Sequence, residues 1–369
     1  MTGTPVLIKA ESLQRSGSFK LRGALSKVAA LGARSAAGLV TASAGNHARA
    51  VALAAGSQDI GCDVFMPLDA AVSKVAAVER LGARVHLAGE SLEEALQLAA
   101  RCAERSGSAF VHPFDDLDVI AGQATLAQEL IDEVPDLARV VVPVGGGGLA
   151  SGVGIALRRA QMEVELVGVQ ARACAPYAAA LERRGPVDAA PGGTIADGIA
   201  IKHPGTLTLP LLRELLSSVE TVSEDEIADA MVFLAERAKL VSEGAGAAAV
   251  AAVLSGRLTH PRGTTVAILS GGNVDSGLLA AVLRRHETAE GRRVRIFTRV
   301  PDQPGGLAEL LGLIAGARAN LVTLEHVREA VPLHVRETGV ELTLETRGPA
   351  HTKEVLAALQ RRGYTVSFE

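Results

Sequence analysis

Short runs rich in β-branched residues alternate with longer Ala- and Leu-rich runs along most of the chain. Such alternation predicts β-α units, in which parallel strands are covered by the helices that connect them. We expect strands at residues 6–9, 38–41, 63–66, 84–87, 140–144, 166–169 and 265–269. We expect helices at residues 19–31, 48–55, 92–106, 123–133, 149–159 and 224–240. The chain is therefore predicted to be an α/β protein.

The composition narrows the class of protein further. With 48% hydrophobic residues over 369 positions, the chain can bury a large core and is long enough for more than one domain. The net charge of −4 and the aromatic content of 2%, with no Trp, argue against nucleic-acid binding and membrane association. Three widely spaced cysteines and an N-terminus without an apolar segment predict a cytoplasmic protein with free thiols.

The sequence pattern changes at a charged stretch, residues 286–293, which we interpret as a linker. After it, strand, helix, strand, strand, helix and strand patterns follow one another over residues 294–369. This β-α-β-β-α-β order is typical of a ferredoxin-like domain. We therefore predict one domain at residues 1–287 and a second at residues 294–369.

Four turns in the first region carry residue types that could do chemistry. The first turn, SGSFKLRGA, places Lys20 at the start of a predicted helix. Burial and the positive end of the helix would both lower the pKa of the lysine amine, which could then form a Schiff base with a carbonyl compound. Taken alone, an ordinary solvated lysine on a helix is the more common case.

The second turn, TASAGNHARA, joins a predicted strand to a helix through Ser43, Gly45, Asn46 and His47. Its backbone N–H groups and short polar side chains could hold a carboxylate. The alternative is a plain N-terminal cap, in which Ser43 or Asn46 only satisfies backbone donors. Taken alone, this turn favours the cap.

The third turn contains four consecutive glycines, Gly145, Gly146, Gly147 and Gly148, between a buried strand and a helix. Without Cβ atoms the backbone can wrap around a phosphate group, which the N–H groups of the helix start can bind. Two glycines would be enough for a turn alone, so the pattern favours a phosphate site. A dinucleotide site would need an acidic residue at the end of the next strand, but that strand ends at Gln170.

The fourth turn, LSGGNVD, places Ser270 directly after a buried strand. A hydroxyl there is well placed to meet a ligand in the crevice of an α/β sheet, although a plain glycine turn would also explain the segment. A reactive lysine, a phosphate cradle and a hydroxyl at a strand end are together what pyridoxal phosphate requires. The four turns therefore predict a pyridoxal phosphate site.

The chain resembles the threonine ammonia-lyases (threonine dehydratases) of the fold-type II pyridoxal phosphate family, which also includes serine dehydratase and serine racemase. The matching segments lie in family order within residues 6–277: KAESLQRSGSFKLRGA, TASAGNHA, HPFDDLDVIAGQATLAQE, VPVGGGGLASGV, TIADGIA, SEGAGA and LSGGNVD. The resemblance implies two open α/β lobes with the cofactor between them, the small lobe at about residues 38–120 being inserted in the large lobe. The C-terminal region, with RVPDQPGGLAELL and ARANLVTLEH, resembles an ACT-like regulatory domain.

The resemblance implies a role for each matching residue. Lys20 would form the Schiff base with the cofactor, and its released amine would remove the substrate Cα proton. Phe19 would pack against the cofactor ring, Asn46 would bind the ring 3-hydroxyl, and Ser270 would face the ring nitrogen. Glu243 would lie near the ring edge, and the four glycines would bind the phosphate. The substrate carboxylate would be surrounded by Ser43, Gly45, Asn46 and His47.

The implied reaction is deamination of L-threonine to 2-oxobutanoate and ammonia, with L-serine giving pyruvate, under allosteric control and in the service of isoleucine biosynthesis. Serine racemase or serine dehydratase is an alternative, but racemase-like members have a second serine where this chain has Ala44. A non-catalytic amino-acid sensor is another alternative. The intact Lys20 and the four glycines argue against the sensor.

The resemblance to ACT-like domains also implies a regulatory site. In such domains a glycine turn and the residue after the first helix flank an amino-acid pocket, which here gives Pro304, Gly305 and Asn320. We expect a branched-chain amino acid as effector, bound by free N–H groups at Gly305, Gly306 and the helix start. A homo-oligomer is expected as well, because these pockets usually lie between paired copies.

Two departures from the family pattern bear on these expectations. The family has roughly forty more residues before the lysine, so either the start of this chain is misplaced or the large lobe lacks an edge. Racemase-like members bind a divalent metal through a Glu, a backbone carbonyl and an Asp, where this chain has Gln170, Cys174 and Pro176. Hard cations need carboxylate oxygens, so we predict no metal at that position.

Overall fold

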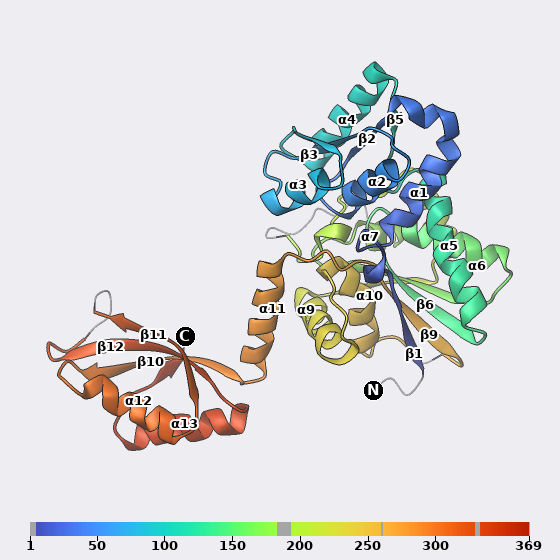
Figure 1. Ribbon diagram of the computed structural model, residues 1–369. Coiled ribbons are helices and arrows are strands. Elements are labelled where there is room, and N and C mark those ends of the chain that lie inside the picture. The colour runs from blue at the N-terminus through green and yellow to red at the C-terminus, as the bar shows by residue number, and fades with distance from the viewer. Residues whose placement is uncertain (1–4, 183–192, 260, 329–332, 369) are drawn as a thin grey trace. The chain divides into compact units, whose positions relative to one another are not determined.

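The computed structural model describes residues 5–182, 193–259, 261–328 and 333–368 (Figure 1). The chain divides into two compact units, Met1–Asp275 and Ser276–Glu369. The predicted boundary at residues 287–294 is therefore corrected, because α11 (Ser276–Ala289) continues through half of the predicted linker and belongs to the second unit. The half of the predicted linker that lies in α11, residues 286–289, includes Glu287 and Ala289, which are good helix formers.

The first unit contains two parallel sheets. The larger sheet has the strand order β1 (Val6–Ala10), β9 (Thr264–Leu269), β6 (Leu137–Pro143), β7 (Glu165–Ala171) and β8 (Ser218–Val222). All neighbouring strands in it are parallel. The central strands β6 and β9 are almost entirely buried, as expected for a parallel sheet covered on both faces. This sheet and the helices packed on it form the large lobe.

The second parallel sheet forms the small lobe. Its strand order is β4 (Arg84–Leu87), β3 (Cys62–Met66), β2 (Leu39–Ala42) and β5 (Ala109–Phe110). These strands lie between α1 (Lys20–Leu31) and α5 (Leu117–Glu133) along the chain. The chain therefore leaves the large sheet after β1, builds the small lobe, and returns to the large sheet at β6.

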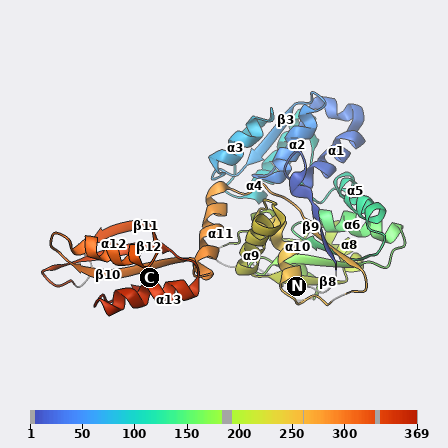
Figure 2. The ribbon, with the colours of Figure 1, turned by 60° about the horizontal axis from the view of Figure 1, so that its bottom comes forward.

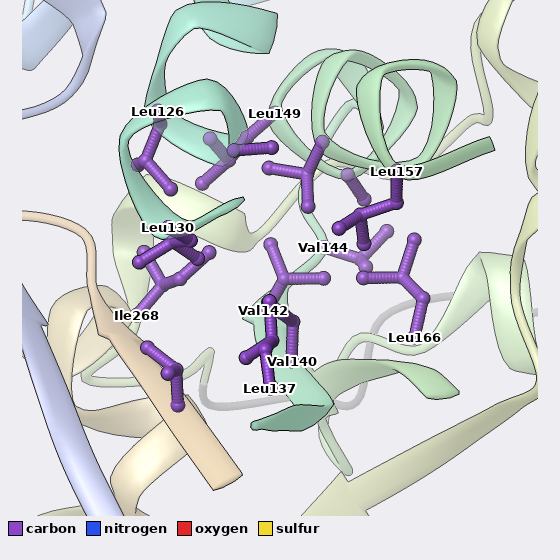
Figure 3. Close-up of a cluster of buried hydrophobic side chains, with 14 of the residues drawn as sticks. Leu126, Leu130, Leu137, Val140, Val142, Val144, Leu149, Leu157, Leu166 and Ile268 are labelled. Atoms are coloured by element: carbon purple, nitrogen blue, oxygen red, sulfur yellow. The ribbon is translucent and has the colours of Figure 1, made fainter. Parts of the chain in front are cut away.

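Helices cover both faces of each sheet. On one face of the large sheet, α5 and α6 (Gly148–Arg159) pack over buried aliphatic side chains of β6, β7 and β9 (Figure 3). On the small sheet, α2 (Asn46–Gly56) and α3 (Val72–Glu79) contribute to one core cluster, and α4 (Leu92–Ser106) contributes to a separate one. Alternate residues of a strand face opposite sides of the sheet, so each sheet contributes side chains to a hydrophobic core on both of its faces.

Several helices on the large lobe depart from the expected element list. The helix expected at residues 224–240 is α9 (Glu224–Phe233) followed by a π-helical turn (Leu234–Ala238), and Lys239 then takes a φ of +60°. Helix α10 (Gly244–Leu254) was not predicted, because it is buried on all sides and has no polar face to give a period. Helix α8 (Thr208–Leu215) is short and was also missed.

The second unit has the predicted β-α-β-β-α-β order. Its elements after α11 are β10 (Arg293–Pro301), α12 (Gly306–Gly316), β11 (Asn320–Val327), β12 (Glu337–Glu345), α13 (Pro349–Arg361) and β13 (Ser367–Phe368). The strands form an antiparallel sheet in the order β11-β12-β10-β13, and α12 packs against α13 (Figure 2). The α/β class with a ferredoxin-like C-terminal unit is confirmed. Within the described ranges, no helix is both long and apolar enough to cross a membrane.

Candidate active site

Lys20 is the first residue of α1, and its side chain is half-buried. Its Nζ donates a hydrogen bond of 2.6 Å to the carbonyl oxygen of Pro113 and lies 5.2 Å from the centroid of the Phe19 ring. Burial around the amine lowers the pKa of Lys20 to about 8, although the Glu243 carboxylate opposes the shift. At neutral pH this amine is therefore more available in its neutral, nucleophilic form than that of a surface lysine.

The turn that carries the lysine meets two of the other predicted turns. The backbone N–H of Phe19 donates a hydrogen bond of 3.1 Å to the carbonyl oxygen of Ser270. Phe114 follows the proline whose carbonyl holds the lysine amine, and its ring lies against the glycine turn, where a Cβ on Gly146 would overlap it. Three segments far apart in the sequence thus surround one place in the first unit.

The glycine loop, residues 145–148, connects β6 to α6 and is buried. A Cβ at any of its four positions would lie 3.0 Å or less from a neighbouring atom, and Gly147 has a φ of +88°. Among the described residues, none accepts a hydrogen bond from the N–H groups of residues 145–147. Buried N–H groups without a partner are costly, and a group of them at a helix start suits an anion. The loop therefore fits the phosphate of pyridoxal phosphate.

Asn46 and Glu243 connect the small lobe to the large lobe. The Nδ2 of Asn46 donates a hydrogen bond of 2.5 Å to Oε1 of Glu243, and its Oδ1 accepts one of 2.7 Å from Nδ2 of Asn273. Glu243 is buried, and this burial, with a contribution from Asp197, raises its pKa to about 7. The two hydrogen bonds fix which way the Asn46 amide faces.

At the start of α2, two predicted carboxylate ligands use their side chains within the protein. The Ser43 Oγ accepts a hydrogen bond of 3.1 Å from the N–H of Gly45, the residue before α2, and no side chain caps the helix itself. The His47 ring is buried with Nε2 3.1 Å from the Val111 carbonyl oxygen, because the second residue of α2 faces the core of the small lobe. Burial, reinforced by the lysine charge, lowers the pKa of His47 to about 3. The N–H groups of residues 46–48 have no hydrogen-bond acceptor among the described residues, so they are the groups of this turn that an anion could bind.

Ser270 follows β9 directly and is buried. The next residue, Gly271, accepts a hydrogen bond of 3.2 Å on its carbonyl oxygen from the N–H of Glu243. A Cβ on Gly271 would overlap the Glu243 carboxylate, which explains the glycine there. The turn after β9 therefore supports both the lysine turn and the start of α10.

Gln170 stands where racemase-like members bind a metal, and its amide is used within the protein. Its Nε2 donates a hydrogen bond of 3.0 Å to the Val144 carbonyl oxygen, and its Oε1 accepts one of 3.0 Å from the N–H of Ala178 in α7 (Pro176–Leu181). No group of three or more His, Cys, Asp or Glu side chains in the described ranges is placed to hold a metal ion. Gln170 thus ties the end of β6 to α7 by hydrogen bonds alone.

Four site residues were not singled out from the sequence. Pro113 and Asn273 lie in the quoted segments HPFDDLDVIAGQATLAQE and LSGGNVD, so those segments contained a signal. Tyr177 and Thr208 bind the carbonyl oxygen of Gly146 from 31 and 62 residues away along the chain. No local pattern marks either of them as part of the glycine loop.

In the second unit, the predicted effector turn lies at the start of α12. Gly305, after Pro304, has a φ of +94°, and a Cβ on it would meet no atom within 4 Å. The N–H of Gly306 donates a hydrogen bond of 3.1 Å to the Gln303 carbonyl oxygen. The expectation of a free N–H at Gly306 is therefore wrong, because the turn closes on itself.

The other predicted effector residue, Asn320, starts β11, and its Nδ2 donates a hydrogen bond of 3.0 Å to Oε2 of Glu345. The 11 residues of α12 separate it from the glycine turn, and such a helix is about 16 Å long. Within one chain the two predicted effector elements therefore lie at opposite ends of α12.

The first unit thus has the fold and the parts of a two-lobed α/β enzyme that uses pyridoxal phosphate: a lysine amine with a lowered pKa beside a buried anion cradle. A family model described as "Pyridoxal-phosphate dependent enzyme" matches residues 1–271. The chain belongs to this family, which confirms the predicted cofactor and enzyme class.

Individual relatives are similar over most of the chain. The L-threonine ammonia-lyase of Thermotoga maritima is 44% identical over 369 residues, covering 99% of this chain and 91% of the relative. Among solved structures, the processed form of threonine deaminase isoform 2 from Solanum lycopersicum has a TM-score of 0.71 at 33% identity, over 77% of this chain and 79% of the other. Maize serine racemase also has a TM-score of 0.71 at 33% identity, over 78% of this chain and 89% of the other.

Proposed function

We propose that the chain deaminates L-threonine to 2-oxobutanoate and ammonia with bound pyridoxal phosphate, and converts L-serine to pyruvate more slowly. The observation that carries this proposal is the half-buried Lys20 amine, with its pKa lowered to about 8, beside the buried glycine loop. Relatives named as threonine ammonia-lyase and threonine deaminase support threonine as the substrate. The product of the proposed reaction is 2-oxobutanoate. For this reason the proposal includes the supply of 2-oxobutanoate to isoleucine biosynthesis.

Residues of the first unit can hold each part of the cofactor. The unpaired N–H groups of the glycine loop would bind the phosphate, and Lys20 would bind the aldehyde carbon. We assign Phe19 to packing on the ring, Asn46 to the 3-hydroxyl, Ser270 to the ring nitrogen and Glu243 to the ring edge, on the basis of their meeting around Lys20. Bound pyridoxal phosphate supplies an electron-accepting ring that stabilises negative charge at the substrate Cα.

The protein groups would then position the substrate and move its protons. The N–H groups of residues 46–48 at the start of α2 hold the substrate carboxylate, which the positive end of that helix also attracts. The released Lys20 amine, whose pKa of about 8 gives it a larger neutral fraction at neutral pH than a surface lysine has, takes the proton from Cα as general base. The Cβ–O bond then breaks, and the hydroxyl leaves as water with a proton equivalent to the one removed from Cα. Water then hydrolyses the unsaturated amine that remains to the 2-oxo acid and ammonia.

Replacement of the lysine tests this proposal directly. Lys20→Ala should lower the rate of 2-oxo acid formation from threonine and serine by at least about 1,000-fold, because nucleophile and general base are lost together. Lys353→Ala, on an exposed position of α13, is the matched control and should keep the full rate. Near-normal turnover by Lys20→Ala would refute the assignment, and an unmodified protein that binds threonine without turnover would favour the sensor.

Serine racemase is the second candidate, favoured by the likeness to the maize racemase. Racemisation needs a proton donor on the ring face opposite the lysine, and we infer that the methyl group of Ala44 leaves this face without one. Chiral analysis of serine after incubation separates the two activities. Formation of D-serine by the unmodified chain would establish a racemase. We expect no D-serine from the unmodified chain and slow formation of D-serine by the Ala44→Ser variant.

We also propose that the second unit binds a branched-chain amino acid and regulates turnover. Pro304 and Gly305 lie at one end of α12 and Asn320 at the other, so a pocket lined by both needs two copies of the chain in a homo-oligomer. Isoleucine or valine should shift the threonine saturation curve, typically by about 5- to 150-fold in apparent affinity.

Point substitutions in the intact chain test this regulation. Asn320→Ala should remove the effector shift without changing turnover in the absence of effector, while Gln360→Ala, an exposed residue of α13, should keep the shift. Identical saturation curves with and without either amino acid would leave the second unit as a scaffold only. A monomer in solution that still responds to effector would contradict the paired pocket.

A further inference from the structure

The carbonyl oxygen of Gly146, in the middle of the glycine loop, lies against two buried hydroxyl groups. The Tyr177 hydroxyl is 2.7 Å from it and the Thr208 Oγ1 is 2.8 Å from it, and the two hydroxyl oxygens are 2.7 Å apart. Each hydroxyl carries one proton, and both cannot donate to each other, so at least one always donates to Gly146. Tyr177 and Thr208 are both 0% exposed, so water does not compete for these contacts.

Holding this carbonyl sets the direction of the next N–H group. The carbonyl of Gly146 and the N–H of Gly147 belong to one planar trans peptide, in which they point in opposite directions. Because the carbonyl faces the two hydroxyls, the N–H of Gly147 faces away from them, and no described residue accepts a hydrogen bond from it. The φ of +88° at Gly147 suits glycine, so this orientation costs the backbone little.

The two hydroxyls are themselves held in place by the large lobe and by the segment that returns from the small lobe. The Tyr177 hydroxyl accepts a hydrogen bond of 3.0 Å from the N–H of Gly205. The Asp115 carboxylate accepts hydrogen bonds from the N–H groups of residues 206–208, at 2.9 to 3.2 Å, and so fixes the start of α8 that carries Thr208. Gln170 binds the N–H of Ala178 and so holds the helix that carries Tyr177.

We propose that Tyr177 and Thr208 are positioning residues for cofactor binding, which orient the N–H of Gly147 toward the phosphate of pyridoxal phosphate. This inference rests on the proposed binding of that phosphate by the glycine loop. It assigns to the two hydroxyls an effect on phosphate-bearing ligands only. The same hydroxyls leave pyridoxal, which has the ring and aldehyde without the phosphate, unaffected.

The test compares pyridoxal phosphate, pyridoxal and inorganic phosphate as ligands of the cofactor-free full chain, with dissociation constants measured by equilibrium dialysis. Tyr177→Phe and Thr208→Val each remove one hydroxyl and should weaken pyridoxal phosphate binding by about two- to fivefold, and together by at least about tenfold. Inorganic phosphate should weaken in parallel, and pyridoxal should stay within about twofold.

Three further variants separate positioning from general damage to the fold. Thr208→Ser keeps a hydroxyl and should restore the affinity for pyridoxal phosphate that Thr208→Val loses. Tyr364→Phe removes the hydroxyl of the other tyrosine of the chain, in the second unit, and should change no dissociation constant. Thermal unfolding of each variant shows whether it is folded, and Thr208→Val provides the test if Tyr177→Phe does not fold.

The outcomes distinguish the inference from the proposed function. Unchanged affinity for pyridoxal phosphate in the double variant, or equal weakening of pyridoxal phosphate and pyridoxal, would overturn the positioning role. Failure of the unmodified chain to bind pyridoxal phosphate at all would overturn the proposed function, and the inference with it. Weakening confined to the two phosphate-bearing ligands supports the inference.

Discussion

Two helix starts in the first unit share a local design and differ in their surroundings. The glycine loop at the start of α6 and the turn at the start of α2 each follow a parallel strand and present N–H groups without acceptors among the described residues. Every glycine of the loop has an atom within 3.0 Å of where its Cβ would be, whereas a Cβ on Gly45 would meet nothing within 4 Å. The turn proposed to bind the phosphate is therefore packed into the core, whereas the turn proposed to bind the substrate carboxylate leaves space around Gly45.

This difference matches the two ligands proposed for the two turns. A cofactor stays bound through many turnovers, so a cradle held by buried hydroxyls and close packing favours it. A substrate must enter and leave in each turnover, so the open start of α2 on the small lobe suits a carboxylate that exchanges. If both assignments hold, the same strand-to-helix turn serves a retained ligand where the core packs against it and an exchanging ligand where it does not.

Among these predictions, the largest effect on activity should come from adding a side chain to the closely packed glycine loop. Gly146→Ala places a methyl group on the Phe114 ring, so we expect loss of pyridoxal phosphate binding and of activity. Overpacking of this kind lowers the free energy of unfolding by about 1–3 kcal/mol. Dialysis against the cofactor and thermal unfolding measure the two effects. A Gly146→Ala protein with normal cofactor content would show that the loop is less tightly held than its contacts indicate.

The same substitution in the open turn should act on the substrate alone. A Cβ on Gly45 would meet no atom within 4 Å, so Gly45→Ala should change the free energy of unfolding less than Gly146→Ala does. A methyl group beside the N–H groups of α2 should raise the KM for threonine about tenfold, the loss of roughly one charge-assisted hydrogen bond. Steady-state kinetics and cofactor titration check this. Loss of cofactor from Gly45→Ala would contradict the proposal that the turn at the start of α2 binds the substrate and not the cofactor.

Lys20 should show its lowered pKa in the pH dependence of cofactor uptake. Only the neutral amine reacts with the aldehyde, so the rate at which cofactor-free protein binds pyridoxal phosphate should rise with pH through a midpoint near pH 8. The Glu243 carboxylate raises the pKa of Lys20, so Glu243→Gln should move the midpoint to lower pH. Stopped-flow absorbance gives both profiles. A midpoint at higher pH in Glu243→Gln would contradict the statement that the Glu243 carboxylate raises the pKa of Lys20.

The smallest effect on turnover should come from His47, whose ring faces the core. His47→Gln should leave the KM for threonine within about twofold, while loss of the contact to Val111 lowers the free energy of unfolding by about 1–3 kcal/mol. The unmodified ring also makes the fold acid-sensitive. Its pKa of about 3 in the folded protein lies below the ordinary histidine value of 6.5, so its contribution to stability is lost as pH falls from about 6.5 to 3.

Denaturant unfolding at several pH values, with the same measurements on the variant, tests both statements about His47. The loss of stability between pH 6.5 and 3 should be smaller in His47→Gln than in the unmodified chain. A tenfold rise in the KM for threonine in His47→Gln, equal to that expected for Gly45→Ala, would indicate that the His47 ring contacts the substrate.

Much of the architecture was predictable because its signals are local. Helix α4 begins and ends where the sequence predicts, since Ser91 caps the Glu94 N–H and small apolar residues recur on one face. Helix α10 was missed because a helix buried on all sides shows no period. The domain boundary was misplaced because charged residues suit an exposed helix such as α11 as well as a linker.

The sequence by itself determined most of the strands and helices, the turns at Lys20, at residues 43–47 and at the glycine loop, and the family to which the chain is similar. Periodicity, glycine conformation and strand-to-helix turns act over a few residues, so one-dimensional patterns carry them. Only the tertiary structure decided that His47 faces the core and that the Gly146 carbonyl is held by Tyr177 and Thr208. Those contacts join residues 31 to 64 positions apart, and hydrogen-bond geometry at such separations depends on how the whole lobe packs.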